Sequence, residues 1–302
     1  MACTHRHLED HRLRRLVALL LVLVWFCWRP LPGTAAGGGR GVRLAGAIEL
    51  DQTSQFSHIR VRRQGNIRML LFVRDGGEEA VQSELNLKRP QEMLSPYTHF
   101  MFSSYLFRPK QEQVLIVGLG GGAMVHFLKF HDPPLRIDAV EIDPAVVEIA
   151  ARYFDVRSGG NVNIITADAL EYLHTTEKRY DVIYIDAFLK PAADTDSTGV
   201  PLRLKTSDFY RNMQKKLQPE GLVVFNLNRY AAVNADIQTI RSAFPQVYVF
   251  QVPEANVVVV GSLAAARESA SVLKARAKEA DRRFKANFSF QETFKKLAPS
   301  RP

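Results

Sequence analysis

The sequence predicts an α/β protein built on a doubly wound, mostly parallel sheet. Strand-like and helix-like segments alternate from residue 113 onward, which is typical of parallel sheets covered by helices on both faces. The apolar run 114–117 stops abruptly in glycines, as a buried parallel strand does before a tight turn. Acidic residues then stand where three of the expected strands end.

The first 45 residues are expected to be a signal or anchor segment followed by a linker. Arginines precede an unbroken apolar run over residues 16–28, and small residues follow it. This order is typical of a secretory signal, and the run is shorter than the about 20 residues of a membrane span. Its tryptophans would also suit an uncleaved helix at the membrane interface. We therefore expect an exported or membrane-anchored protein. An anchored domain on the cytoplasmic face of the membrane is an equally open alternative.

Residues 46–89 are expected to form a small antiparallel β-domain. Apolar and basic residues alternate over 59–62, an apolar run covers 67–73, and glycine-containing turns follow each of these two segments. This pattern is typical of β-hairpins. Hairpin edges can pair between subunits, so a homo-oligomer is one open expectation.

The larger domain is expected over residues 90–262. Residues 90–107 carry apolar side chains at helical spacing apart from Pro96, and we interpret Tyr97 as one of these apolar positions. Strands are expected at 113–118, 135–142, 162–165, 180–186, 221–228, 247–252 and 256–261, and helices at 122–131, 144–154, 168–175, 206–217 and 233–243. The last two strands suggest an antiparallel edge. Residues 263–302 are expected to be a charged helical tail, on the surface or against a partner.

Charge and cysteine content exclude several function classes. Residues 46–262 hold 23 basic against 25 acidic side chains, so the net positive charge of the chain belongs to its two ends. The domain therefore has no general attraction for nucleic acid. Both cysteines, Cys3 and Cys27, precede the globular part, which excludes cysteine chemistry there. The histidines show no ligand spacing, so we expect no metal.

A nucleoside-binding unit is expected in the run Val114-Leu-Ile-Val-Gly-Leu-Gly-Gly-Gly-Ala123 and the residues after it. Gly118, Gly120, Gly121 and Gly122 allow a sharp turn and a close approach of the backbone to a ligand. Glu141 closes the next strand about 20 residues later, where a carboxylate can accept hydrogen bonds from the two ribose hydroxyls. The spacing G-x-G-x-x-A also occurs in dinucleotide-binding folds, which keeps NAD-dependent oxidoreduction among the alternatives.

Two further carboxylates stand at strand ends. Asp168 follows the third strand, where it would accept from an adenine amino group or cap the next helix. Asp186 closes the fourth strand, near the reactive end of a bound cofactor. Asp181 is expected to open its strand rather than to act in chemistry. We therefore regard Asp186 as the catalytic candidate.

From about Ser54 to Gly261, the chain is similar to the spermidine synthase family of polyamine aminopropyltransferases, within the methyltransferase fold. The matching segments are Ser54–Val61, Asp75-Gly76, Gln91–Leu94, the glycine loop, Glu141–Asp143, Ala167–Ala169 and Ile185-Asp186. The resemblance implies a seven-stranded sheet and decarboxylated S-adenosylmethionine as aminopropyl donor. It also implies a diamine such as putrescine as acceptor, and donor binding that includes Gln91. Asp186 would be the general base, with Tyr184 or Phe188 as an apolar wall for the acceptor.

Two departures from the family pattern keep other functions open. The family loop reads G-G-G-D-G-G, with Gly121 here in place of the acid; the family segment D-S-x-D-P reads Asp186-Ala-Phe-Leu-Lys-Pro191, with Leu189 and Lys190 where the second acid is expected. Without an acid at Gly121, ordinary S-adenosylmethionine would also fit. A methyltransferase acting on a small molecule and a non-catalytic nucleoside-binding domain at the membrane are therefore the alternatives. The resemblance to a divergent spermidine synthase-like branch, often found with membrane segments, suits residues 16–28.

Overall fold

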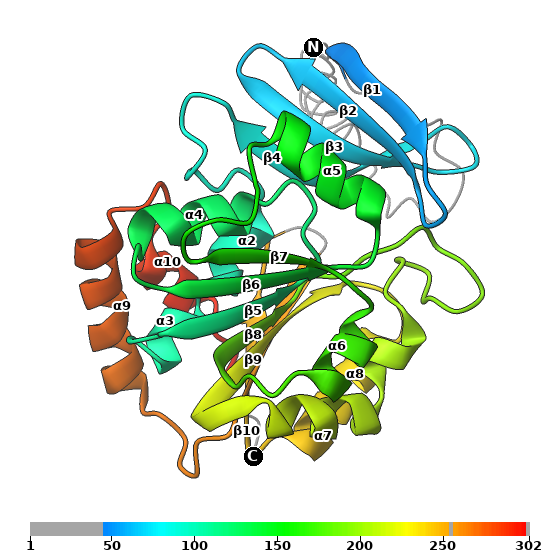
Figure 1. The fold of residues 1–302 in the computed structure, drawn as a ribbon. Helices are drawn as coiled ribbons and strands as arrows, with labels where there is room; N and C mark the ends of the chain where they lie inside the picture. The colour runs from blue at the N-terminus through cyan, green and yellow to red at the C-terminus, as the bar shows by residue number, and fades with distance from the viewer. Residues whose placement is uncertain (1–44, 254–255, 300–302) are drawn as a thin grey trace, which may run out of the picture. The chain divides into compact units, whose positions relative to one another are not determined.

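The predicted doubly wound sheet is confirmed by the computed structural model, which describes residues 45–253 and 256–299. Seven strands pair in the order β10-β11-β9-β8-β5-β6-β7 (Figure 1). β5 to β9 pair in parallel, and β11 and β10 complete one edge in antiparallel fashion. The strands are β5 (Gln113–Val117), β6 (Arg136–Glu141), β7 (Val162–Thr166), β8 (Tyr180–Ile185), β9 (Leu217–Asn228), β10 (Gln246–Gln251) and β11 (Asn256–Ser262).

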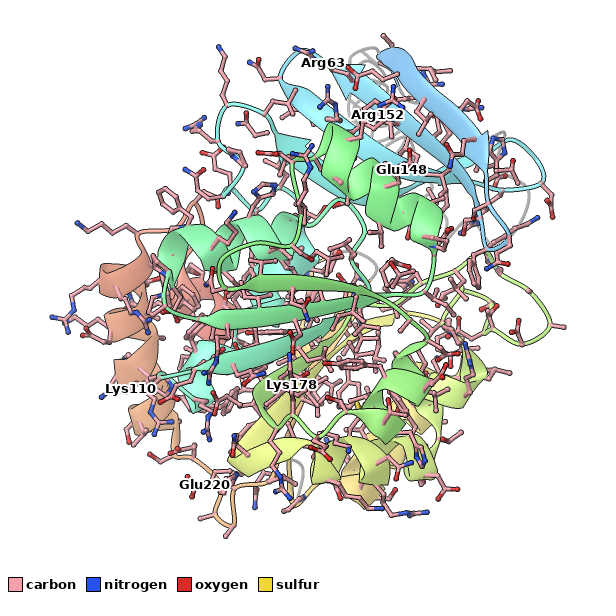
Figure 2. The ribbon with its side chains drawn as sticks, in the orientation of Figure 1. Arg63, Lys110, Glu148, Arg152, Lys178 and Glu220 are labelled. Carbon is pink, nitrogen blue, oxygen red and sulfur yellow. The ribbon has the colours of Figure 1, made fainter. Side chains whose placement is uncertain are left out.

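Helices cover both faces of this sheet because its strands are apolar on both sides (Figure 1). One face packs against α2 (Pro96–Met101), α3 (Ser104–Phe107), α4 (Ala123–His131), α9 (Ala270–Phe284) and α10 (Phe290–Lys295). The other packs against α6 (Ala169–Thr175), α7 (Ser207–Lys215) and α8 (Val233–Ala243). Charged side chains such as Lys110 and Lys178 line the outside of the domain (Figure 2).

Local sequence explains where several helices begin. α5 (Pro144–Tyr153) starts with proline at its first position, and the side chain of Asp143 accepts a hydrogen bond from the Ala145 amide. Thr206 caps α7 in the same way through the Phe209 amide. These caps satisfy amides that would otherwise have no partner.

The N-terminal part forms a separate four-stranded antiparallel sheet that packs on α5. Its order is β1-β2-β3-β4, from β1 (Ala47–Thr53), β2 (His58–Gln64), β3 (Ile67–Val73) and β4 (Glu79–Asn86). Buried apolar residues of this sheet meet Val146, Ile149 and Phe154. This packing brings β4 next to the glycine loop, so that a Cβ built at Gly120 would lie 3.6 Å from the Cβ of Ser83.

The C-terminal helices belong to the core of the domain. Leu273, Ala277 and Phe284 of α9, and Phe290 of α10, are buried in the cluster that covers the sheet. Asp281 joins the two helices by accepting from the Phe290 amide at 2.6 Å. The charged residues of this segment lie on the outward side of amphipathic helices, which reconciles its charge with its packing.

In the part of the chain that the structure describes, no helix is long and apolar enough to cross a membrane. The apolar run 16–28 lies outside the described residues. The localisation expected from it therefore stays a prediction.

Candidate active site

The strand order reverses between β5 and β8, which are neighbours in the sheet. β6 and β7 follow on one side of β5, whereas β8 and β9 lie on the other. The crevice at the carboxyl ends of the strands beside such a switch point is where open α/β sheets bind ligands. Val117 and Ile185 are paired in register, so the next residues, Gly118 and Asp186, meet at this point.

Gly118 allows the glycine loop to lie directly against the end of β8. Its φ is +95°, and a Cβ built there would lie 2.2 Å from the carbonyl oxygen of Asp186. The amide of Asp186 in turn donates to the Val117 carbonyl at 2.9 Å. Any side chain at position 118 would therefore push apart the two strand ends that form the site.

Two donors from different elements hold the carboxyl group of Asp186. The hydroxyl of Tyr97, from α2, donates to Oδ2 at 3.0 Å, and the amide of Asn226, from β9, donates to Oδ1 at 2.8 Å. Burial raises the pKa of Asp186, while the hydrogen bonds from Asn226 and Tyr97 act in the opposite direction. A carboxyl with this environment is suited to accept a proton during a reaction.

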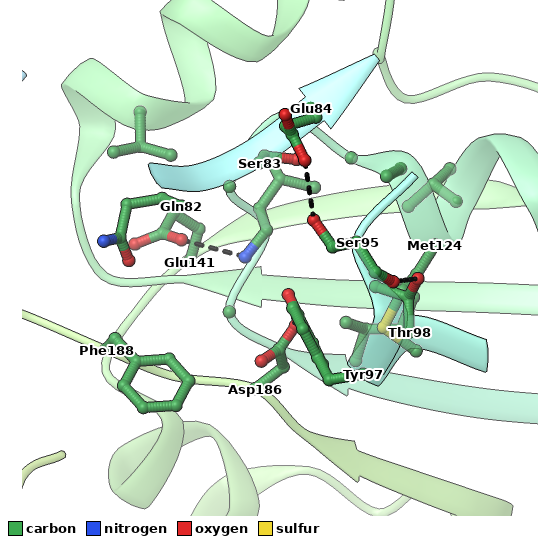
Figure 3. Close-up of a pocket in the computed structure, with 18 of the residues that line it drawn as sticks. Gln82, Ser83, Glu84, Ser95, Tyr97, Thr98, Met124, Glu141, Asp186 and Phe188 are labelled. Carbon is green, nitrogen blue, oxygen red and sulfur yellow. Dashed lines mark hydrogen bonds between the residues drawn. The ribbon is translucent and has the colours of Figure 1, made fainter. Parts of the chain in front are cut away.

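Three cavities surround the end of β8. The glycine-loop cavity, about 730 Å³ including its open mouth, is lined by residues that include Gly118, Gly120, Gly122, Glu141, Asp186 and Tyr97 (Figure 3). The amide cavity is lined by residues that include Gln82, Glu84, Lys190, Asn226, Asn228 and Asn256. The Asp168 cavity is lined by residues that include Glu141, Ala167, Asp168, Ala169 and Arg203. Phe188 lines all three, so they meet around it.

Glu141 stands between the glycine-loop cavity and the Asp168 cavity, because it lines both. One carboxylate oxygen accepts a hydrogen bond from the amide of Leu119 at 2.9 Å (Figure 3), and the other accepts from the amide of Asp143 at 3.0 Å. Burial raises the pKa of Glu141, and these amide hydrogen bonds lower it. Each oxygen retains a second lone pair that a ligand hydroxyl can use.

Of the two roles expected for Asp168, the structure shows the helix cap, and the contact with an adenine stays a prediction. Asp168 lines its cavity, and its Oδ1 caps α6 by accepting from the Leu170 amide at 2.9 Å. Its Oδ2 forms an ion pair with Arg203. A ligand amino group would have to share these oxygens with two protein donors.

Gly121 and Gln91 differ from the other predicted site residues. Neither is among the residues lining the three cavities. A Cβ at Gly121 would lie 2.9 Å from the ring of Phe154 and 3.0 Å from the Ser83 hydroxyl. The space that the side chain of the family's acid would need is thus occupied by Phe154 and Ser83. Gln91 lies in the turn between β4 and α2, and the cavity wall there is formed by Leu94, Ser95 and Tyr97 instead.

Of the two aromatic residues expected as an apolar wall, Phe188 lines the cavities and Tyr184 does not. Tyr184 is fully buried in the core beneath α3, and its hydroxyl lies 2.7 Å from the Ser104 hydroxyl. Tyr184 lies within β8, where helices cover the sheet, whereas Phe188 follows the end of the strand, at the edge where the cavities open. Asp181 accepts from the Glu112 amide at 2.6 Å and pairs with Arg108 at 2.5 Å, which fits the structural role expected for it. Among the residues that the structure describes, no three His, Cys, Asp or Glu side chains are grouped so that they could hold a metal ion.

Sequence reasoning missed Tyr97 and Asn226. Tyr97 fits the helical apolar spacing of residues 90–107, and only the fold turns its hydroxyl toward Asp186. Asn226 did carry a signal, since it is a polar residue near the carboxyl end of an otherwise apolar strand, at the edge where ligands bind.

A seven-stranded, mostly parallel sheet with a glycine loop and carboxyls at its switch point defines a methyltransferase-like α/β protein. Its fold matches human methyltransferase-like protein 13 in complex with SAH (TM-score 0.59, 23% identity, 65% of this chain and 95% of that one). It also matches a spermidine synthase in complex with the transition state analogue AdoDATO (TM-score 0.64, 20% identity, 84% of this chain and 85% of that one).

The sequence comparisons identify the family. Residues 91–274 match the family described as spermine/spermidine synthase domain. The polyamine aminopropyltransferase of Vibrio vulnificus is 31% identical over 208 residues, which are 68% of this chain and 67% of the relative. The chain therefore belongs to the spermine/spermidine synthase family, and it spans about two thirds of the length of this curated relative.

Proposed function

We propose that this protein transfers an aminopropyl group from decarboxylated S-adenosylmethionine to a small amine, a diamine such as putrescine. The observation that carries the proposal is Asp186, which lies beside the glycine loop with its carboxyl held by Tyr97 and Asn226. Family membership supports the same activity.

The reaction is a direct displacement. The lone pair of the acceptor nitrogen forms a bond to the methylene carbon next to the donor's sulfonium. The carbon–sulfur bond breaks, its electron pair stays on sulfur, and methylthioadenosine leaves. Aliphatic amines are protonated at neutral pH, so a base must first take a proton to expose the lone pair. Asp186 is the base in this proposal, and its buried position favours uptake of the proton.

The three cavities suggest which part of each substrate would bind where. Glu141 would accept from the ribose hydroxyls of the donor, with the adenine in the Asp168 cavity. Gly118, Gly120 and Gly122 would lie against the donor in the glycine-loop cavity. The amine would enter through the amide cavity, which shares Tyr97 and Phe188 with the glycine-loop cavity.

Methyl transfer from ordinary S-adenosylmethionine is the second candidate function, and the structure around Gly121 supports it. Phe154 and Ser83 fill the position from which an acid would repel the donor carboxylate. They also make Gly121→Asp a poor test of donor choice, because the new side chain would have to displace a buried ring.

The test is product formation by the full chain. Supplied with decarboxylated S-adenosylmethionine and putrescine, it is expected to release methylthioadenosine and spermidine in equal amounts, measured by mass spectrometry. Parallel reactions with ordinary S-adenosylmethionine and the same amine are expected to give no methylated product. Methylated amine with no spermidine would replace the proposal by its second candidate.

A further inference from the structure

The amide cavity contains one carboxylate that could bind an acceptor ammonium. The charged side chains among its lining residues are Arg74, Glu84 and Lys190. The family's second acid is absent from the segment that contains Leu189 and Lys190. If the acceptor is a diamine, its second ammonium therefore needs an acid from elsewhere in the fold.

The two cationic residues of this cavity already have acidic partners. Lys190 pairs with Asp75 of the turn between β3 and β4 at 2.5 Å, and Arg74 lies 3.9 Å from Glu78. Both pairs are substantially exposed, so their interaction energies are small. They nevertheless partly neutralise the positive charge at the cavity mouth. A diamine, which is itself positively charged, is therefore repelled less strongly there.

Glu84 is placed where the amide cavity joins the glycine-loop cavity, because it lines both. Its Oε2 accepts a hydrogen bond from the Ser95 hydroxyl at 3.2 Å (Figure 3). Its Oε1 has no hydrogen-bonding partner among the residues that the structure describes, so it can accept from a ligand.

Glu84 also lies close enough to the catalytic candidate to act on the same substrate. Burial raises the pKa of Tyr97, and the negative charges of Asp186 and Glu84 raise it further. The two carboxylates come from different sheets of the fold and line the same glycine-loop cavity, where Tyr97 donates its hydrogen bond to Asp186 (Figure 3). An amine that reaches Asp186 through the amide cavity passes Glu84.

We propose that Glu84, carried by the small N-terminal sheet, binds the second ammonium of the acceptor and selects diamines over monoamines. This inference rests on the proposed function. The acid that the loop after β8 lacks is thus supplied by β4, and a charge-assisted hydrogen bond of this kind contributes more than a neutral one.

The experiment compares putrescine with butylamine, which has the same carbon chain and lacks the second amine. The full chain, its Glu84→Gln variant and its Glu84→Asp variant are assayed for methylthioadenosine release. Glu148→Gln is the matched control, since Glu148 is exposed on α5 (Figure 2). Binding of methylthioadenosine by calorimetry checks that each variant keeps a folded donor site.

The preference for putrescine over butylamine in kcat/KM is expected to fall about tenfold or more in Glu84→Gln. The fall should come from a higher KM for putrescine, and Glu84→Asp and Glu148→Gln should keep a clear preference. An unchanged preference in a Glu84→Gln variant that binds methylthioadenosine normally would overturn the role of Glu84. If the wild-type chain releases no methylthioadenosine with either amine, the proposed function fails first, and this role fails with it.

Discussion

The pKa of Asp186 is governed by opposing effects that single substitutions can separate. Burial raises it, whereas hydrogen bonds from Asn226 and Tyr97 lower it by stabilising the charged carboxylate. The proposed base must be deprotonated to accept a proton from the amine. Activity should therefore decline as the pH falls through the pKa of Asp186.

Replacing Tyr97 with phenylalanine tests this balance. Tyr97→Phe removes one donor to the carboxylate, so the pKa of Asp186 should rise and the acidic limb of kcat/KM should move to higher pH. Tyr153→Phe is the control, because within the described part of the chain the Tyr153 hydroxyl makes only a 3.5 Å contact to the Glu49 carbonyl. A pH profile unchanged in Tyr97→Phe, or shifted toward lower pH, would contradict the account.

Individual site residues could be predicted from sequence only where they stand at the end of a predicted strand. Gly118, Glu141 and Asp186 stand at the ends of predicted strands that share one edge of a parallel sheet. Glu84 and Tyr97 come from elements that precede this sheet in the chain. Their approach to Asp186 depends on packing between distant segments, which no local pattern encodes.

The loop between β8 and α7 is held by a partly buried charge cluster. Lys205 pairs with Asp196 of the loop and, at 2.6 Å, with Asp236 of α8; the Tyr230 hydroxyl lies 3.0 Å from its amine. Lys205 is only 9% exposed as a side chain. The loop carries Phe188 and Lys190 to the cavities, so this cluster fixes one wall of the proposed acceptor site.

Removing the lysine should therefore destabilise the protein. Lys205→Met leaves the buried Asp196 and the partly buried Asp236 without their cation, and breaking such a pair typically costs about 3–5 kcal/mol of unfolding free energy. Lys215→Met, at an exposed position of α7, is the control and should change stability little. Urea denaturation measures both, and a loss below about 1 kcal/mol in Lys205→Met would show that the cluster is not needed for stability.

The helices and strands were predictable because their side-chain periodicity is local. The runs over 114–117 and 182–185 are apolar throughout, as buried parallel strands are, and Asp143-Pro144 marks a helix start. The loop after β8 gave no such signal. Its conformation depends on Lys205 meeting Asp196 of the same loop and Asp236 of α8. Such ion pairs follow no side-chain period that a sequence would display.

For the described domain as a whole, the site depends on packing between two sheets. α5 lies against the N-terminal sheet and connects β6 to β7, so it fixes β4 relative to the glycine loop. The charge of residues 263–302 favoured a surface helix, yet the buried face of α9 joins the core. The amphipathic spacing of Leu273, Ala277, Ala280 and Phe284 was the signal for that packing.

The measurement that tests the central claim most directly is turnover by Asp186→Asn, with decarboxylated S-adenosylmethionine and putrescine as substrates. The amide cannot accept the amine's proton, so kcat should fall about 10²- to 10⁴-fold. Methylthioadenosine should bind as it does to the wild type. Asp155→Asn, at a side chain that is 87% exposed, is the matched control and should keep full activity. Turnover near the wild-type level in Asp186→Asn would contradict the assignment of Asp186 as the general base.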